Sequence, residues 1–148
     1  MDYINKMHLK IPALSLNESF ARGVVGAFCV SINPTLEEIN DLKTAVSEAV
    51  TNCVVHGYQN KSGDVQIDAT LFCDRLEIEI CDFGVGIENT EQAMQPFFTT
   101  KPDEERSGMG FTVMQAFMDE VQLFSKPQQG TKIKMTKYFG KKGADVDA

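Results

Sequence analysis

Alternation of apolar and polar residues predicts five β-strands along this chain of 148 residues. Apolar residues occupy every second position in three of five short segments, which is the pattern of a strand with one buried face, and the last two segments flank a turn near the end of the chain. Asp74-Arg75 separates two of these segments and the stretch 126–130 separates another two, and both are rich in turn-forming residues. The predicted strands are residues 7–11, 65–71, 76–80, 121–125 and 131–138.

Two segments before the first hairpin have helical spacing. The first runs from Asn17, expected as its N-cap, to about Val30. The second begins at Thr35, whose spacing to Glu38 matches a capping box, and Gly57 is placed to end it as a C-cap. The expected core-facing residues are Phe20, Val24, Ala27 and Phe28 in the first helix, and Leu36, Ile39, Leu42, Val46, Ala49, Val50 and Cys53 in the second.

The stretch 87–107 lacks a periodic apolar pattern and contains two prolines, so we expect a long loop that acts as a lid. A third helix follows Ser107, with apolar residues at Phe111, Met114, Ala116, Phe117 and Val121. This order of elements predicts an α+β fold, a two-layer α/β sandwich whose mixed, mostly antiparallel sheet carries the helices on one face. The expected organisation is one domain over residues 1–139 and a disordered tail at 140–148.

Charge and cysteine content narrow the class of protein. The net charge of −7 disfavours general binding to nucleic acid or to anionic membranes. The chain has no signal peptide and no apolar run near the ~20 residues of a membrane span, so a cytoplasmic location is expected. The four cysteines form no C-x-x-C pair and stand in apolar runs, which predicts buried, reduced thiols at Cys29, Cys53, Cys73 and Cys81.

Two glycine pairs predict a nucleotide pocket. Asp82 follows an alternating strand and precedes Gly84 and Gly86. A carboxylate at a strand end can accept a hydrogen bond from a ligand, and the glycines let backbone approach a flat ligand closely. The second pair, Gly108 and Gly110, stands where a helix begins and offers free N–H groups to an anion. We therefore expect the base at the first pair and the phosphates at the second.

Other nucleotide-binding classes are unsupported. The sequence Asp82-Phe83-Gly84 occurs in eukaryotic protein kinases, but this chain has no upstream glycine-rich loop with a strand lysine and no His-Arg-Asp catalytic loop. Neither glycine pair completes a P-loop or a dinucleotide-binding fingerprint.

Two pairs of polar residues are spaced four apart on the first two helices. Glu48 and Asn52 share a face beside small alanines, where they are either solvated or available to another molecule. Glu18 and Arg22 form either a solvated ion pair or a partner-binding face. Spacing alone leaves both questions open.

The order of these features resembles the Bergerat-type ATP-binding fold shared by gyrase B, Hsp90, sensor histidine kinases and MutL. Within that superfamily, several stretches resemble the anti-sigma serine kinases, and particularly their anti-sigma-F branch. The resemblance covers residues 5 to about 138, and the lack of a phosphoacceptor helical hairpin sets the chain apart from a sensor histidine kinase. The matching stretches are residues 17–22, 47–52, 55–58, 82–86, 96–102, 105–111 and 117–121.

The resemblance implies a role for each residue of the base pocket. Asp82 would accept a hydrogen bond from the adenine amine, and it would reject guanine, which carries an oxygen there. Gly84 and Gly86 would give the base and ribose room. Thr131 would complete the adenine pocket, although it also fits an ordinary strand threonine.

The remaining implied roles concern phosphate chemistry. Asn52 would ligate Mg²⁺ through its side-chain oxygen, and Glu48 would be the general base for the attacking hydroxyl. Gly108 and Gly110 would donate backbone N–H groups to phosphate. The lid residues implied to contact the nucleotide are Thr99, Lys101, Arg106 and Ser107, with a solvated role for Lys101 also open.

The implied function is that of an ATP-dependent anti-sigma factor that sequesters the sporulation sigma-F and also acts as a serine kinase. It would use ATP and Mg²⁺, release ADP, and phosphorylate and thereby inactivate the anti-anti-sigma protein. Glu18 and Arg22 would bind these partners, and the chain would form a homodimer. The open alternatives are the paralogous stress-response anti-sigma kinase, a catalytic domain serving a histidine kinase, and an anti-sigma module that holds ATP without transferring phosphate.

Overall fold

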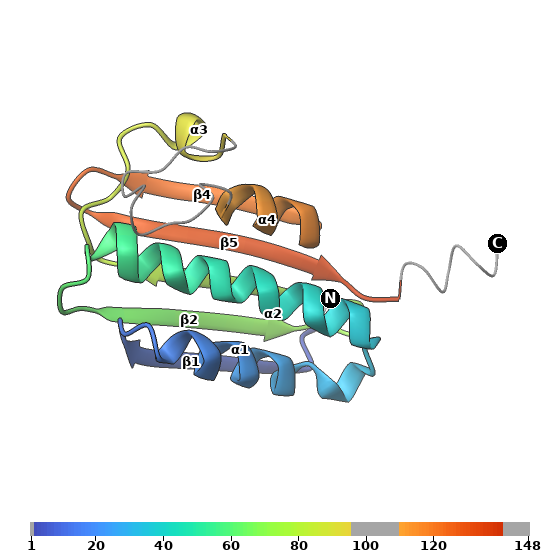
Figure 1. Ribbon diagram of the computed structural model, residues 1–148. Coiled ribbons are helices and arrows are strands. Elements are labelled where there is room, and N and C mark those ends of the chain that lie inside the picture. Colours follow the sequence, from blue (N-terminus) through green and yellow to red (C-terminus); the bar gives the residue numbers. More distant parts are fainter. Residues whose placement is uncertain (1, 96–109, 141–148) are drawn as a thin grey trace.

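An antiparallel sheet forms one layer of the molecule and helices form the other (Figure 1). The structure is a computed structural model that describes residues 2–95 and 110–140. Its strands lie in the order β1-β2-β3-β5-β4, and all four pairings in the described part are antiparallel. The strands are β1 (Asn5–Pro12), β2 (Asp64–Leu71), β3 (Arg75–Asp82), β4 (Glu120–Lys126) and β5 (Gly130–Tyr138).

Helices cover one face of this sheet, with α2 (Leu36–Thr51) in the middle (Figure 1). The helices are α1 (Asn17–Phe28), α2 (Leu36–Thr51), α3 (Thr90–Ala93) and α4 (Gly110–Phe117), and α2 continues as a π-helical turn over Asn52–Gly57. The two-layer α+β sandwich is therefore confirmed. The sheet shows no parallel pair among the described strands, so the expectation of a mixed sheet was too broad.

The core lies between α2 and the sheet. From α2, Leu42 and Val46 are fully buried, and they face fully buried strand residues such as Ile78 and Ile80. Burial of each such side chain away from water stabilises the folded state by roughly 1.5–3 kcal/mol. The predicted capping box is present, because the Glu38 N–H donates to Thr35 Oγ1 at 3.1 Å and the Thr35 N–H donates to Glu38 Oε1 at 2.8 Å.

The buried residues of α1 stand one position later in the sequence than predicted. Its buried residues include Ala21 and Val25, whereas Phe20, predicted to face the core, is 52% exposed. A Cβ at Gly26 would lie 2.6 Å from Lys43 Cε of α2, so α1 presents its small residues where the two helices approach. Asn17 is also not the N-cap, since it is the first helical residue and its side chain donates to the Pro12 carbonyl.

Several other predicted positions differ in the structure. Leu36 is 76% exposed because it is the first residue of α2, before the helix packs on the sheet. Within the predicted loop at 87–107, α3 is a short helix capped by Asn89, whose side chain accepts the Gln92 N–H. Ala116, one of the apolar residues expected along the third helix, is exposed, whereas Val121 belongs to β4, which matches the predicted strand 121–125.

The cysteine prediction is correct for two of the four thiols. Cys29 and Cys53 are buried, and burial raises the pKa of Cys29 to about 12. Cys73 is exposed because it lies in the turn between β2 and β3, and Cys81 is half-buried on the sheet face that carries no helices. All four are free thiols.

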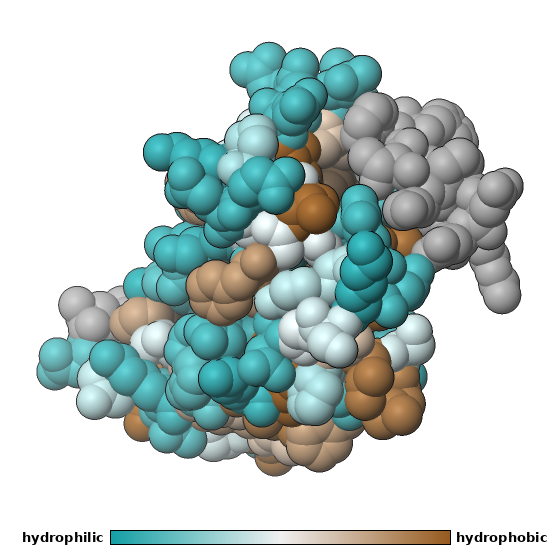
Figure 2. Space-filling view, turned by 90° about the vertical axis from the view of Figure 1, so that its left-hand side faces the viewer, coloured by the Kyte–Doolittle hydropathy of each residue, from teal (hydrophilic) through white to brown (hydrophobic). Residues whose placement is uncertain are grey.

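The C-terminal ends of β3 and β4 and the start of β5 lie at the same end of the molecule as the C-terminal end of α2 (Figure 1). Figure 2 faces this end and shows apolar surface in separate patches among hydrophilic side chains. Gly140, at the start of the predicted tail, is tied to the fold by its N–H, which donates to Glu38 Oε2 at 2.8 Å. No helix in the described part of the chain is long and apolar enough to cross a membrane.

Candidate nucleotide-binding site

Asp82 is the last residue of β3, and its buried carboxylate has one oxygen without a hydrogen-bond partner among the described residues. The residue is 2% exposed, and its Oδ1 accepts the Gly84 N–H at 2.9 Å. Its Oδ2 is buried and has no hydrogen-bond partner among the described residues. Burial raises the pKa of this carboxyl, while the Gly84 N–H and the neighbouring polar groups of Cys53 and Thr131 act in the opposite direction. Because an unsatisfied buried acceptor is costly, the atom is suited to a donor from a ligand.

The turn that ends α2 packs directly against this carboxylate. A Cβ on Gly57 would lie 2.5 Å from Asp82 Oδ2, and a Cβ on Gly84 would overlap the carbonyl of Gly57. That carbonyl accepts the Val85 N–H at 2.9 Å. Gly57 does not adopt the left-handed backbone of a glycine C-cap, so its predicted role was wrong. Close approach to the strand end is what requires glycine there.

Tyr58 holds the loop after β3 in place. Its hydroxyl accepts the Phe83 N–H at 2.8 Å and donates to the Asp64 carbonyl at 2.6 Å. The sequence analysis did not assign Tyr58 a role, and its only signal was its place in the stretch 55–58 that carries the family resemblance. Gly86 has φ of 75° and approaches the Lys126 carbonyl, where a Cβ would not fit.

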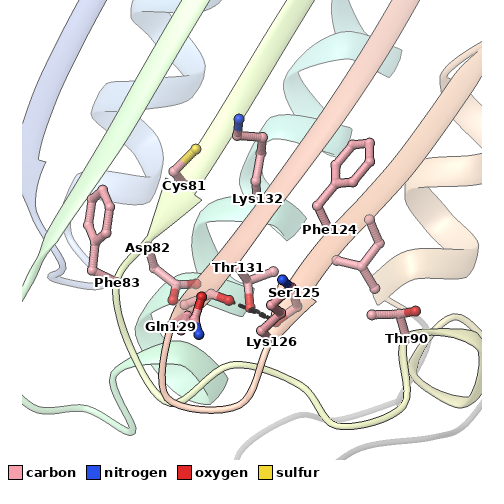
Figure 3. A pocket seen from close by; sticks show the side chains of 12 residues that line it. Cys81, Asp82, Phe83, Thr90, Phe124, Ser125, Lys126, Gln129, Thr131 and Lys132 are labelled. Carbon is pink, nitrogen blue, oxygen red and sulfur yellow. Dashed lines mark hydrogen bonds between the residues drawn. The ribbon is translucent and has the colours of Figure 1, made fainter.

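A cavity of about 460 Å³ opens where β3 and β4 end and β5 begins (Figure 3). Thr131, which is 5% exposed, is paired with Asp82 in the register of β3 and β5, and both line this cavity. Figure 3 shows their side chains next to each other, with Ser125 beside Thr131. The lining residues are Cys81, Asp82, Phe83, Thr90, Leu123, Phe124, Ser125, Lys126, Gln129, Gly130, Thr131 and Lys132.

Glu48 and Asn52 lie one turn apart at the C-terminal end of α2. Both are partly exposed, and the Asn52 N–H donates to the Glu48 carbonyl. The helix widens to π-geometry from Asn52 onward, a feature often found at functional sites. The described residues contain no group of three or more His, Cys, Asp or Glu that could hold a metal ion. A Mg²⁺ bound at Asn52 would therefore depend mainly on phosphate and water oxygens, which suits this ion.

Glu18 and Arg22 connect α1 to α2, an arrangement that neither interpretation of the pair anticipated. The Arg22 guanidinium donates to Ser47 Oγ at 3.2 Å, and Glu18 Oε2 accepts the Thr51 hydroxyl at 3.0 Å. Ser47 precedes Glu48 and Thr51 precedes Asn52 in the sequence. The two side chains thus contact the same stretch of α2 that carries the candidate catalytic residues.

The second glycine pair is only partly described. Gly110 is the first residue of α4 and is half-buried. The remaining residues predicted to contact the nucleotide lie outside the described part of the chain, and their roles stay predictions. They are Thr99, Lys101, Arg106, Ser107 and Gly108.

A buried strand-end carboxylate beneath helices on an antiparallel sheet is the arrangement of an ATPase domain of the histidine-kinase type. Residues 12–137 match the family described as "Histidine kinase-like ATPase domain". This match covers most of the chain, so nucleotide binding follows from the class of the domain. The fold is also shared with a crystal structure of the RsbU and RsbW domains of Rv1364c from Mycobacterium tuberculosis, with a TM-score of 0.65 and 18% identity over 91% of this chain and 32% of that chain.

Comparison with curated proteins narrows the class further. An anti-sigma F factor from Thermoanaerobacter sp. is 57% identical over 95% of this chain and 98% of its own length. One from Clostridium acetobutylicum is 57% identical over 91% of this chain and 94% of its own length, and one from Anoxybacillus flavithermus is 52% identical over 95% and 97%. The chain belongs to the anti-sigma F factor family.

Proposed function

We propose that this chain is an ATP-dependent anti-sigma factor that sequesters sigma-F and a serine kinase that phosphorylates the anti-anti-sigma protein. The observation that carries the nucleotide part is Oδ2 of Asp82, a buried acceptor without a described partner, which packs against glycine backbone on a residue that lines the cavity. The partner assignment rests on the anti-sigma F factor relatives.

Asp82 and Thr131 bind the adenine in this proposal. The free Oδ2 accepts one proton of the exocyclic amine. Gly84 and Gly86 let the loop after β3 pack against the backbone of Gly57 and Lys126 and stay close to the base and ribose. A guanine base would place an oxygen against the carboxylate and leave that acceptor unsatisfied. Binding of ADP uses the same contacts.

Glu48 and Asn52 act at the phosphate end. Glu48 takes the proton from the attacking serine hydroxyl, since it is partly exposed and one turn from the metal ligand. Asn52 would hold Mg²⁺ through its side-chain oxygen, and the bound ion would supply positive charge beside the phosphates. The phosphate site is completed by six further residues, which are Gly108, Gly110, Thr99, Lys101, Arg106 and Ser107.

The partners bind on α1, through Glu18 and Arg22, and the functional unit is a homodimer. Phosphorylation of the anti-anti-sigma protein adds about −1.5 to −2 charges to its docking surface, which releases it. The ATP and ADP states must then differ in partner affinity, because a ligand shifts a binding equilibrium only by its differential affinity for the two states.

The test is incubation of the purified chain with γ-phosphate-labelled ATP, Mg²⁺ and the anti-anti-sigma protein, together with a sigma-F pull-down. Phosphoserine on the anti-anti-sigma protein and ATP-dependent capture of sigma-F are the expected results. Acid-labile phosphohistidine would indicate a catalytic domain of a histidine kinase instead. Sigma capture without transfer would indicate a binding module, and capture of a stress-response sigma factor in place of sigma-F would indicate the paralogous kinase.

A further inference from the structure

Ser125 connects three segments of the base pocket through one hydroxyl group. Its Oγ accepts the Ile87 N–H at 2.8 Å and donates to the Gly130 carbonyl at 2.8 Å. It also lies 2.9 Å from Thr131 Oγ1 (Figure 3). The first of these partners belongs to the loop after β3 and the other two to β5. The residue lies on β4 and is half-buried.

The partners of Ser125 determine the direction of its bond to Thr131. A hydroxyl carries one proton and two lone pairs. The Gly130 carbonyl can only accept, so the Ser125 proton is committed to it, and the Ile87 N–H occupies one lone pair of Ser125. The contact with Thr131 must then use the second lone pair, which makes the Thr131 hydroxyl the donor. The reverse direction would leave two acceptor oxygens facing each other at 2.8 Å.

This direction sets what Thr131 can offer to a ligand. With its one proton spent on Ser125, Thr131 Oγ1 presents only lone pairs to the cavity. Its register partner Asp82, which also lines the cavity, carries a second acceptor with no partner among the described residues, the buried Oδ2. Thr131 Oγ1 and Asp82 Oδ2 can therefore both accept hydrogen bonds from a ligand and cannot donate one. A ligand carbonyl beside them would face two acceptors.

We propose that Ser125 is a specificity-determining residue that fixes the Thr131 hydroxyl as an acceptor, so that the pocket selects a 6-amino purine over a 6-oxo purine. This inference rests on the proposed nucleotide function and deepens it. Ser125 acts through Thr131 and is thus a positioning residue. Without it, the Thr131 hydroxyl is free to rotate and donate to a 6-oxo group, so that Asp82 alone opposes such a base.

The test compares the affinities of the full chain for ATP and for inosine triphosphate, measured by calorimetry with Mg²⁺. In Ser125→Ala, the preference for ATP over inosine triphosphate should fall about 3- to 10-fold, the equivalent of one neutral hydrogen bond. Ser125→Thr keeps the hydroxyl and should retain the wild-type ratio. Thr136→Val changes a threonine of β5, the strand that carries Thr131, at a position outside the cavity, and it serves as the matched control.

A second arm separates orientation of Thr131 from a general loss of structure. In a Thr131→Val background there is no hydroxyl to orient, so adding Ser125→Ala should leave the ratio unchanged. If Ser125→Ala does not fold, Ser125→Cys takes its place, because a thiol of similar size hydrogen-bonds only weakly. An unchanged ratio in a variant that still binds ATP would overturn the inference alone. Failure of the wild-type chain to bind either nucleotide would overturn the proposed function as well.

Discussion

Gly57 and Asp82 meet where the helix layer reaches the end of the sheet, and there is no room for a side chain between them. A Cβ on Gly57 would lie 2.5 Å from Oδ2 of Asp82, the same atom that lacks a hydrogen-bond partner in the described structure. The turn that ends α2 therefore packs against the carboxylate of Asp82, a residue that lines the cavity. The predictions below depend on this contact and on the hydrogen bonds around it.

Replacement of Gly57 by alanine should damage the pocket more than the fold. The added methyl group must displace the Asp82 carboxylate, at a cost of about 1–3 kcal/mol for overpacking. We expect ATP affinity to fall by at least about tenfold in calorimetry. Gly23→Ala is the control, because nothing lies within 4 Å of a Cβ there. It should stabilise α1 by about 0.5–1 kcal/mol and leave ATP binding intact.

Replacement of Asp82 by asparagine should weaken ATP binding and stabilise the unliganded chain. Loss of a hydrogen bond to a charged group lowers affinity about 10- to 100-fold. The variant also removes a buried ionised group whose pKa is raised by burial. A gain of about 1 kcal/mol would raise Tm by about 2–4 °C for a chain of this length. Equal ATP affinity in variant and wild type would remove Asp82 from the base pocket.

The raised pKa of Asp82 also sets a pH dependence. The folded state binds the proton more tightly than the unfolded state, so stability falls as pH rises from the ordinary aspartate pKa through the raised value. The Tm advantage of Asp82→Asn should therefore be larger at pH 7 than near pH 4. The ATP affinity of the wild-type chain should rise with pH, because at low pH a proton occupies the Asp82 carboxylate that accepts the adenine amine. Thermal melts and calorimetry across this range test both trends.

Replacement of Glu48 by glutamine should separate binding from chemistry. The amide keeps the shape of the side chain but cannot take the serine proton, so transfer to the anti-anti-sigma protein should fall about 10²- to 10⁴-fold. ATP affinity should remain close to that of the wild type. Transfer at an unchanged rate would exclude Glu48 as the base. Glu37→Gln, at the exposed start of the same helix, is the matched control.

Arg22→Glu tests the partner surface on α1. The charge reversal should weaken binding of both sigma-F and the anti-anti-sigma protein by at least about tenfold, as measured by surface plasmon resonance. Ser47→Ala removes the hydrogen bond that Arg22 donates to α2 but keeps the charge, and it should retain partner binding. Unaltered affinity of Arg22→Glu for both partners would place their docking surface elsewhere.

Thr35→Ala tests the capping box at the start of α2. Loss of the bond to the Glu38 N–H should cost about 1 kcal/mol and lower Tm by about 2–4 °C. Thr44→Ala changes an exposed threonine in the same helix, whose hydroxyl donates to the Asn40 carbonyl, and should not lower Tm. Equal melting temperatures for the two variants would contradict the cap. Nucleotide binding should be unaffected in both.

Local rules predicted the strands, the second helix and its cap because each depends on neighbours in the sequence. The Thr35–Glu38 box spans one helical turn, and the hairpin at Asp74-Arg75 needs only two alternating segments and a turn. The same rules misplaced the buried face of α1. Its residues at 20 and 21 are both apolar, and the small side chains that face α2 were selected by the distance between two helices.

The sequence by itself determined the alternating strands, the capped central helix and the presence of an acidic residue and glycines after a strand. Tertiary structure decided what those residues touch. Gly57 is fixed by the Asp82 carboxylate 25 positions later, and the direction of the Thr131 hydroxyl is fixed by Ser125 on the neighbouring strand. Such contacts join residues far apart in the chain, and hydrogen-bond direction depends on every partner of a hydroxyl at once. No spacing rule along one sequence contains that information.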